Sequence, residues 1–305
     1  LTYDDVNIVP KYSELESRSK VDLTTRFTKN TVLTIPIVSS PMDTITELDM
    51  ALEMLELGGV GVLHRFNTIE EQSKMMKSVW REWDSWFDIP KSVRGTDEER
   101  TLETEWNEWW NDYSRSNPPT KEDWKDLKDR FWWADYTTRD EKRWQKRPLS
   151  AAIGVTGDYL ERAQELFNNG CNVIVIDVAH GHHKFVGGAI EKIKKNISGV
   201  EVIAGSVATE ESTKYLCEKG ADAIRVGIGN GSLCETRIRT GVGIPQVTAL
   251  IDCVSVADTY MFLLLLMVGL GILVMCVKDL LVGLTRLCWA PFYRVQKKVQ
   301  VKLKR

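Results

Sequence analysis

Six short apolar segments alternate with segments of helical spacing along most of this chain. The apolar segments are bounded by Gly or Pro and cover residues 35–40, 59–64, 149–154, 173–177, 200–204 and 223–227. Helical periodicity is found at residues 46–57, 158–168, 186–195 and 210–219. A strand, a helix and a further strand in succession form a unit with parallel strands. The sequence therefore predicts an α/β fold built on a parallel sheet.

The charge balance argues against a nucleic-acid-binding protein. The chain has 305 residues with 40 Lys and Arg against 43 Asp and Glu, a net charge of −3. Nucleic-acid binders carry an excess of basic residues, so we expect no nucleic-acid partner. Six Cys residues include no Cys-x-x-Cys pair, which predicts free thiols in a reducing, cytoplasmic compartment. No signal segment begins the chain, and its start at Leu1 indicates that some preceding residues are missing.

A Trp-rich insert separates the second and third predicted strands. Ten of the eleven Trp residues lie between Trp80 and Trp144, among many charged residues and without any Cys or His. Their near-helical spacing predicts a small helical subdomain held together by aromatic contacts. Packing within the insert or onto a partner subunit is favoured over stacking on a nucleobase.

The C-terminal part is strongly apolar. Residues 260–277 carry no charge, residues 280–293 are interrupted by Arg286, and eight basic residues against one Asp follow from Lys278 to the end. This length is close to that of a transmembrane helix, and the basic end would stay on the cytoplasmic side. We expect membrane association, either as a span or as a re-entrant arrangement at the cytoplasmic face, with a buried core helix as the alternative.

A glycine-rich loop after the last predicted strand carries the strongest chemical signal. It contains Gly at positions 227, 229 and 231, followed by Ser232, Cys234, Thr236 and Arg237. Alternate glycines leave backbone amides free to surround an anion, and they display Cys234 as a potential nucleophile. This loop, with Arg-Thr-Gly-Val-Gly-Ile-Pro-Gln following at residues 239–246, resembles the catalytic loop of the IMP dehydrogenase/GMP reductase family.

Further motifs extend the resemblance over residues 1–79 and 148–253. They are Leu-Thr-Tyr-Asp-Asp-Val at 1–6, Ser-Ser-Pro-Met-Asp-Thr-Ile-Thr-Glu at 39–47, Gly-Gly-Val-Gly-Val-Leu-His at 58–64, Ala-Ile-Gly-Val-Thr-Gly at 152–157, Asp-Val-Ala-His-Gly-His at 177–182 and Ala-Gly-Ser-Val-Ala-Thr at 204–209. The resemblance implies a (β/α)₈ TIM barrel with its active site at the carboxyl ends of the strands. We expect a barrel truncated to six βα units and divided into four parts: barrel residues 1–79, the insert at 80–147, barrel residues 148–253, and the hydrophobic segment at 254–305.

The resemblance also implies roles for individual residues. Cys234 would attack the purine carbon between the two ring nitrogens, and Thr236 would assist proton transfer. Ser232 would hold the nucleotide phosphate, Ser40 and Met42 would line the nucleotide pocket, and Asp177 would receive the ribose hydroxyls of NAD. The backbone carbonyls of Gly229, Gly231 and Cys234 would contribute to a potassium site.

The implied activity is the oxidation of IMP to XMP with NAD by a homo-oligomer, of which the tetramer is the family form. The alternatives are a GMP reductase, which would use NADP, and a catalytically incomplete, membrane-associated homologue that binds nucleotide or a full-length subunit.

The insert occupies the place of the regulatory CBS modules. Departures from the family are Ser206 in place of Asn, Glu235 beside the nucleophile, and the absence of strands seven and eight and of the mobile flap. His180, His182 and His183 suggest zinc, but neighbours on one loop diverge, so we expect no zinc site.

Overall fold

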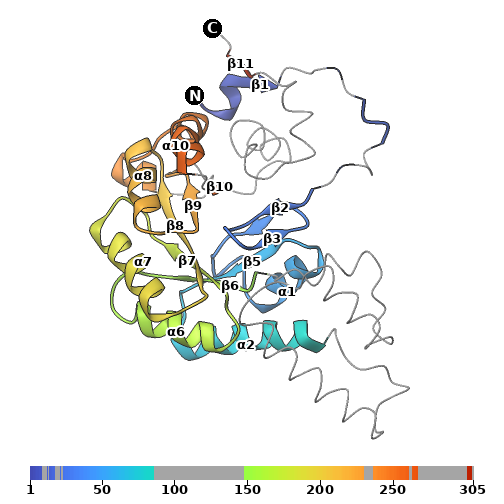
Figure 1. The fold of residues 1–305 in the computed structure, drawn as a ribbon, viewed down its shortest axis with the longest axis vertical. Helices are drawn as coiled ribbons and strands as arrows, with labels where there is room; N and C mark the ends of the chain where they lie inside the picture. Colours follow the sequence, from blue (N-terminus) through green and yellow to red (C-terminus); the bar gives the residue numbers. More distant parts are fainter. Residues whose placement is uncertain are drawn as a thin grey trace, which may run out of the picture.

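The computed structural model describes residues 1–8, 12, 14–17, 21, 23–85, 148–229, 236–260, 263–266 and 301–303 (Figure 1). Most of the Trp-rich insert and most of the C-terminal apolar part therefore lie outside the described residues. The predicted helical subdomain stays a prediction.

One curled parallel sheet of seven strands forms the centre of the molecule. Its order is β10-β9-β8-β7-β6-β5-β4, and every neighbouring pair is parallel. The strands are β4 (Val38–Ser39), β5 (Val60–Leu63), β6 (Ser150–Ile153), β7 (Val173–Asp177), β8 (Glu201–Val207), β9 (Ala223–Val226) and β10 (Leu263–Leu266). All six predicted strands are present, and the fold class, a truncated barrel-type α/β sheet, is confirmed; β10 and β4 are the edges of the sheet among the residues that the structure describes.

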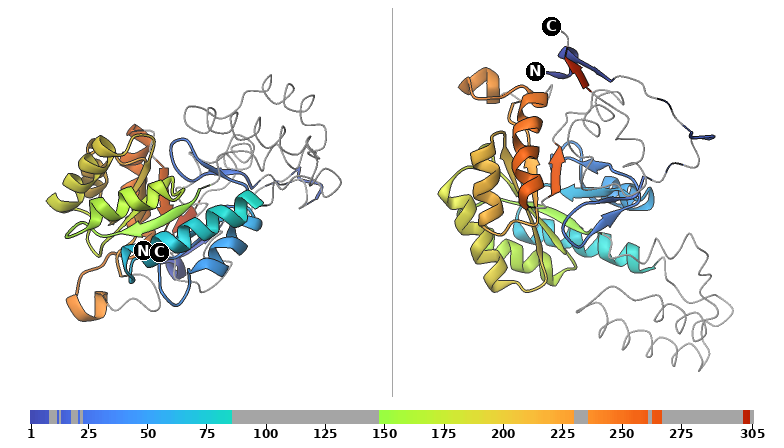
Figure 2. Two further views of the ribbon diagram at one scale, coloured as in Figure 1. Left: turned by 90° about the horizontal axis from the view of Figure 1, so that it is seen from below. Right: turned by 45° about the horizontal axis from the view of Figure 1, so that its top comes forward.

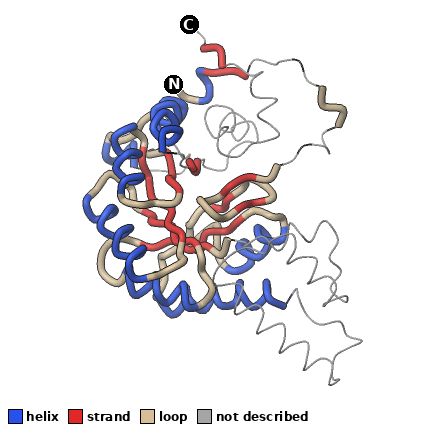
Figure 3. The backbone as a smooth tube through the Cα atoms, viewed as in Figure 1, coloured by secondary structure: helices blue, strands red, loops and turns tan. Residues whose placement is uncertain are grey.

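Helices cover the outer face of this curve in chain order (Figure 3). They are α1 (Leu48–Glu56), α2 (Ile69–Ser85), α6 (Tyr159–Asn168), α7 (Lys184–Asn196), α8 (Glu210–Glu218) and α10 (Gln246–Tyr260), with the short α9 (Thr236–Thr240) after β9. The four predicted helices are confirmed to within two residues at each end. For example, α8 begins after Thr209, whose hydroxyl accepts from the amide of Ser212 in a reciprocal cap.

Alternation of side chains along the strands produces two apolar layers. Val173 and Val175 of β7 point inward and join Val62, Ile203 and other small apolar residues. Ile174 and Ile176 point outward and pack against the helices in the larger core. Successive side chains of a strand point to opposite faces, so every second residue of β7, counted from Val173, lies inside the curve.

A hairpin fills the amino end of the curve. It consists of β2 (Thr25–Arg26) and β3 (Val32–Leu33), paired antiparallel, and its Phe27 and Leu33 belong to the inner layer. The Glu201 carboxylate at the start of β8 is 4% exposed and binds the hairpin turn. Because apolar side chains fill the amino end, chemistry is expected at the carboxyl ends.

The two chain ends lie together (Figure 2). After the short η1 (Tyr3–Asp5), β1 (Val6–Ile8) pairs antiparallel with β11 (Val301–Leu303). The backbone of Leu1 also contacts Thr248 in α10, where its carbonyl accepts from the amide of Thr248 at 3.2 Å. Residues almost a chain length apart in sequence thus meet at one side of the sheet.

The predicted membrane segment needs correction. The sheet has one strand in addition to the six predicted, because Leu263–Leu266, inside this segment, forms β10 and pairs with β9. The segment 260–277 is therefore not one continuous transmembrane helix: α10 ends at Tyr260, and β10 begins three residues later. None of the helices in the described residues has both the length and the apolar character to cross a bilayer. The expected boundaries near residues 80 and 254 coincide with α2, which continues to Ser85, and with α10, which ends at Tyr260. The division of the chain into four parts stays a prediction.

Candidate active site

The carboxyl ends of the parallel strands gather the residues that the sequence singled out. Ser40 and Met42 follow β4, Asp177 ends β7, Gly229 follows β9, and Thr236 begins α9. Parallel strands end at one edge of a sheet, so these residues belong to the same face of the molecule. Gly231, Ser232 and Cys234 lie outside the described residues, and their positions stay predictions.

Asp177 is joined to an arginine two strands away. The Arg225 Nη2 donates to the Asp177 Oδ1 at 2.5 Å, and the two side chains are 9% and 21% exposed. The register places Asp177 beside Gly205 and Gly205 beside Arg225, on three successive strands. A Cβ atom on Gly205 would lie 2.7 Å from the Cβ of Arg225, so the glycine leaves the space that Arg225 needs to reach across β8.

Arg225 was not identified in the sequence analysis. Its Nε and Nη1 are buried, and neither has a hydrogen-bond partner among the described residues. Buried guanidinium donors usually bind an acceptor, so these groups fit a ligand with carbonyl, hydroxyl or phosphate oxygens at the mouth of the curve. The signal was present in the sequence: a single charge inside the apolar strand Ala-Ile-Arg-Val requires a partner.

The first glycines of the glycine-rich loop pack closely against residues that follow the loop in the chain. Gly227 and Gly229 have φ angles of +127° and +76°, which favour glycine. A Cβ on Gly227 would lie 2.6 Å from the Oε1 of Gln246, and one on Gly229 would lie 2.9 Å from the Cβ of Arg237. The Gln246 Nε2 also donates to the Val226 carbonyl at 3.3 Å. The start of the loop is therefore held against the segment that follows it.

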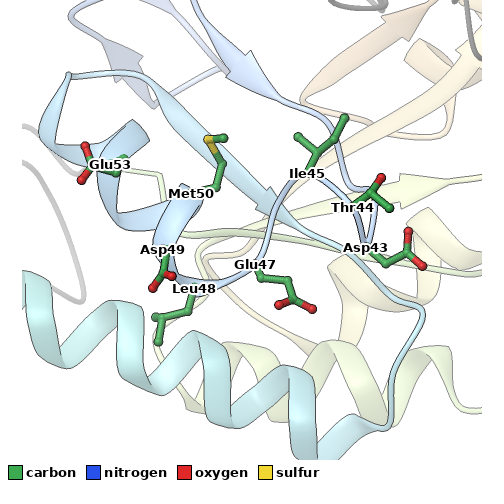
Figure 4. A pocket seen from close by; sticks show the side chains of 8 residues that line it. All are labelled: Asp43, Thr44, Ile45, Glu47, Leu48, Asp49, Met50 and Glu53. Atoms are coloured by element: carbon green, nitrogen blue, oxygen red, sulfur yellow. The ribbon is translucent and has the colours of Figure 1, made fainter.

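A surface pocket lies beside α1 (Figure 4). Four of its lining residues are carboxylates; the lining is Asp43, Thr44, Ile45, Glu47, Leu48, Asp49, Met50 and Glu53. This negative charge repels a phosphate group, so the pocket is not a candidate for the nucleotide phosphate site.

The three clustered histidines have structural contacts. His183 caps α7 by accepting from the amide of Phe185 at 3.2 Å, and the ring of His182 lies 5.2 Å from that of Tyr215. Among the described residues, no three His, Cys, Asp or Glu side chains are grouped as metal ligands. The rings of His180 and His182 are 6.3 Å apart at a steep angle.

The described cysteines are buried and unreactive in character. Burial raises the pKa of the Cys171 and Cys217 thiols to about 12 and that of Cys253 to about 11. At neutral pH these thiols stay protonated, and the thiol form is a poor nucleophile.

The chain is similar in sequence to a known family of enzymes over most of its length. A family model described as the IMP dehydrogenase / GMP reductase domain matches residues 1–280. An inosine-5'-monophosphate dehydrogenase of Nitrosopumilus maritimus is 33% identical over 321 residues, which cover 85% of this chain and 67% of that protein. The enzyme of the same name from Cryptosporidium parvum is 41% identical over 262 residues, covering 85% and 59%, and that of Bacillus subtilis is 33% identical over 328 residues, covering 84% and 66%. The chain thus spans about 59 to 67% of the length of these three relatives. A match of this extent shows that the chain belongs to the IMP dehydrogenase/GMP reductase family.

Proposed function

We propose that this chain carries an IMP dehydrogenase-type site that oxidises IMP to XMP. The observation that carries the proposal is the convergence of the family's expected site residues at one edge of the sheet, namely Ser40, Met42, Asp177, Gly229 and Thr236. The relatives named above are all dehydrogenases, which favours this reaction over that of a GMP reductase.

In the proposed reaction the Cys234 thiolate adds to the purine carbon between the two ring nitrogens, forming a C–S bond. When bound, NAD would supply the acceptor for the hydride that leaves this carbon. Water then displaces the sulfur, which releases XMP and restores the thiol, and Thr236 assists the proton transfer from water. A covalent adduct divides one difficult step into two easier ones.

The residues around Asp177 fit a dinucleotide. The Asp177 carboxylate is partly exposed and could accept from ribose hydroxyls, and the two unpartnered donors of Arg225 could hold an acceptor oxygen beside it. A GMP reductase would use NADP at this place. These contacts would hold the dinucleotide at the carboxyl ends of the strands, where the proposed nucleotide contacts also lie.

The backbone carbonyls of Gly229, Gly231 and Cys234 would contribute to the proposed potassium site. Carbonyl oxygens suit an alkali cation because their dipoles replace its hydration shell. The proposed assembly is a homo-oligomer, which sedimentation of the purified chain would detect.

Thiol labelling tests the proposal. We expect iodoacetamide at pH 7.5 to modify Cys234 first, because backbone amides of a glycine-rich loop stabilise a thiolate. Burial protects Cys171, Cys217 and Cys253, because it raises their pKa values to about 12, 12 and 11 and keeps these thiols protonated at this pH. IMP should slow the labelling of Cys234, as measured by peptide mapping, and the Cys234→Ser variant should lose the labelled peptide.

Labelling of Cys217 ahead of Cys234, with no protection by IMP, would contradict the proposed site. Raising the pH is the internal control. The buried thiols should gain label as the pH approaches their raised pKa values, whereas Cys234 should already be labelled near neutrality.

A further inference from the structure

The turn between β4 and α1 carries two of the proposed nucleotide contacts, Ser40 and Met42. Its backbone is closed by short hydrogen bonds. The amide of Met42 donates to the Ser40 carbonyl at 2.8 Å, and the amides of Ile45 and Thr46 donate to the Met42 carbonyl at 3.0 and 2.9 Å. These hydrogen bonds close the turn on itself.

Thr46 reaches back to the beginning of this turn with its side chain. The residue is fully buried, and its hydroxyl lies 2.6 Å from the Ser40 carbonyl oxygen and 2.8 Å from the Oγ of Ser39. A carbonyl only accepts, so the Thr46 hydroxyl donates to Ser40 and accepts from the Ser39 hydroxyl. The Thr46 hydroxyl therefore contacts both Ser39, the last residue of β4, and Ser40, the residue after it.

The methyl group of Thr46 lies against β5. A Cβ atom on Gly61 of β5 would lie 3.2 Å from the Thr46 Cγ2 and 2.7 Å from the Cα of Ala51 in α1. The missing side chain at Gly61 lets the turn and α1 lie directly on β5. The next residue, Glu47, contacts the buried His64 at the end of β5, with 3.3 Å between Oε1 and Nε2.

We infer that Thr46 is a positioning residue that holds the Ser40–Met42 turn in the geometry required for the nucleotide. It acts through the Ser40 carbonyl and does not touch the ligand itself. The inference rests on the proposed function for its ligand, but the ordering of the turn can be measured without any ligand. A preorganised turn lowers the entropic cost of binding.

Two substitutions at Thr46 distinguish the contribution of its hydroxyl group from that of its branched shape. Thr46→Val keeps both branches at Cβ and removes the hydrogen bonds, whereas Thr46→Ser keeps the hydroxyl. Thr44→Val is the matched control, because Thr44 is exposed on the same turn and lines the surface pocket (Figure 4). The first readout is amide hydrogen exchange of the peptide that covers residues 38–47, with the peptide that covers β7 as the internal reference.

We expect Thr46→Val to speed the exchange of the turn peptide about tenfold relative to the β7 peptide, because a buried hydrogen bond is lost. Thr46→Ser and Thr44→Val should exchange like the wild type. The second readout is IMP affinity by calorimetry, which should fall about five- to tenfold in Thr46→Val and be retained in Thr46→Ser.

Unchanged exchange in Thr46→Val, or an equal increase in the β7 peptide, would overturn the inference, because the hydroxyl would then have no local positioning role. Equal IMP affinity in wild type and Thr46→Val would also overturn it. If the wild-type chain binds no IMP, the proposed function fails, while loosening confined to the turn in Thr46→Val with rescue by Thr46→Ser still supports the ordering role.

Discussion

Replacing Glu201 by alanine should lower the free energy of unfolding by about 3 to 5 kcal/mol, because it removes the acceptor of a buried hydrogen-bond network and each buried donor left without a partner costs about 1 to 3 kcal/mol. The carboxylate accepts four hydrogen bonds from the hairpin turn: from Thr28 Oγ1 at 2.6 Å, Thr31 Oγ1 at 2.5 Å, and the amide and side chain of Asn30 at 2.9 and 3.2 Å. In the variant these donors would lose their acceptor inside the protein. The hairpin should then detach from the amino end of the sheet.

Urea denaturation followed by circular dichroism would measure this loss. Glu211→Ala is the matched control, because Glu211 is exposed on α8 and its replacement should change stability by less than about 0.5 kcal/mol. Glu201→Gln tests charge separately from shape and should be intermediate, since the amide offers one acceptor oxygen in place of two. A stability loss for Glu201→Ala no larger than that of the control would show that the hairpin does not depend on this carboxylate.

Replacing Asp177 by alanine should destabilise the fold by about 3 kcal/mol, because Arg225 would be left as a buried and uncompensated charge. Both residues are mostly buried, and Arg225 already has two unpartnered N–H groups. The same variant should weaken the binding of NAD at least tenfold if Asp177 holds its ribose hydroxyls. Thermal unfolding and cofactor titration would measure the two effects separately.

The control for this prediction is Asp158→Ala. Asp158 pairs with Arg162 at 3.2 Å but is 49% exposed, so its loss should cost less than about 1 kcal/mol. Arg162 also donates to Gln72 and to the Asn67 carbonyl and keeps those partners. Equal destabilisation by Asp177→Ala and Asp158→Ala would mean that the Arg225 pair contributes no more than a surface ion pair.

Local sequence patterns predicted much of the sheet. The apolar segments at 149–154 and 173–177 became β6 and β7 almost residue for residue, because buried parallel strands are continuous apolar runs bounded by turns. The resemblance of the motifs to a known family singled out Asp177, Ser40 and Met42, and each of them ends or follows a predicted strand. The glycine-rich loop was also recognisable, since each positive φ angle at Gly227 and Gly229 requires a residue without a Cβ atom.

The hydrophobic C-terminal part shows where local pattern fails. Leu263–Leu266 belongs to a long uncharged run that reads as a membrane span, yet these residues form a strand beside β9. A short apolar run is compatible with a lipid-facing helix and with a buried strand alike, because both environments exclude water. In this fold β9 offers a free strand edge, and pairing with it selects the buried strand over the lipid-facing helix.

The sequence by itself determined the alternation of strands and helices, the parallel sheet, and the edge at which the proposed site residues lie, because these depend on the period of apolar side chains within a few turns of chain. Tertiary structure alone decided which distant residues meet. Glu201 binds a hairpin about 170 residues earlier in the chain, and Arg225 reaches Asp177 over the bare Cα of Gly205. Such contacts depend on the register of neighbouring strands and on the space left by a missing side chain, and neither quantity is encoded in the local period of the sequence.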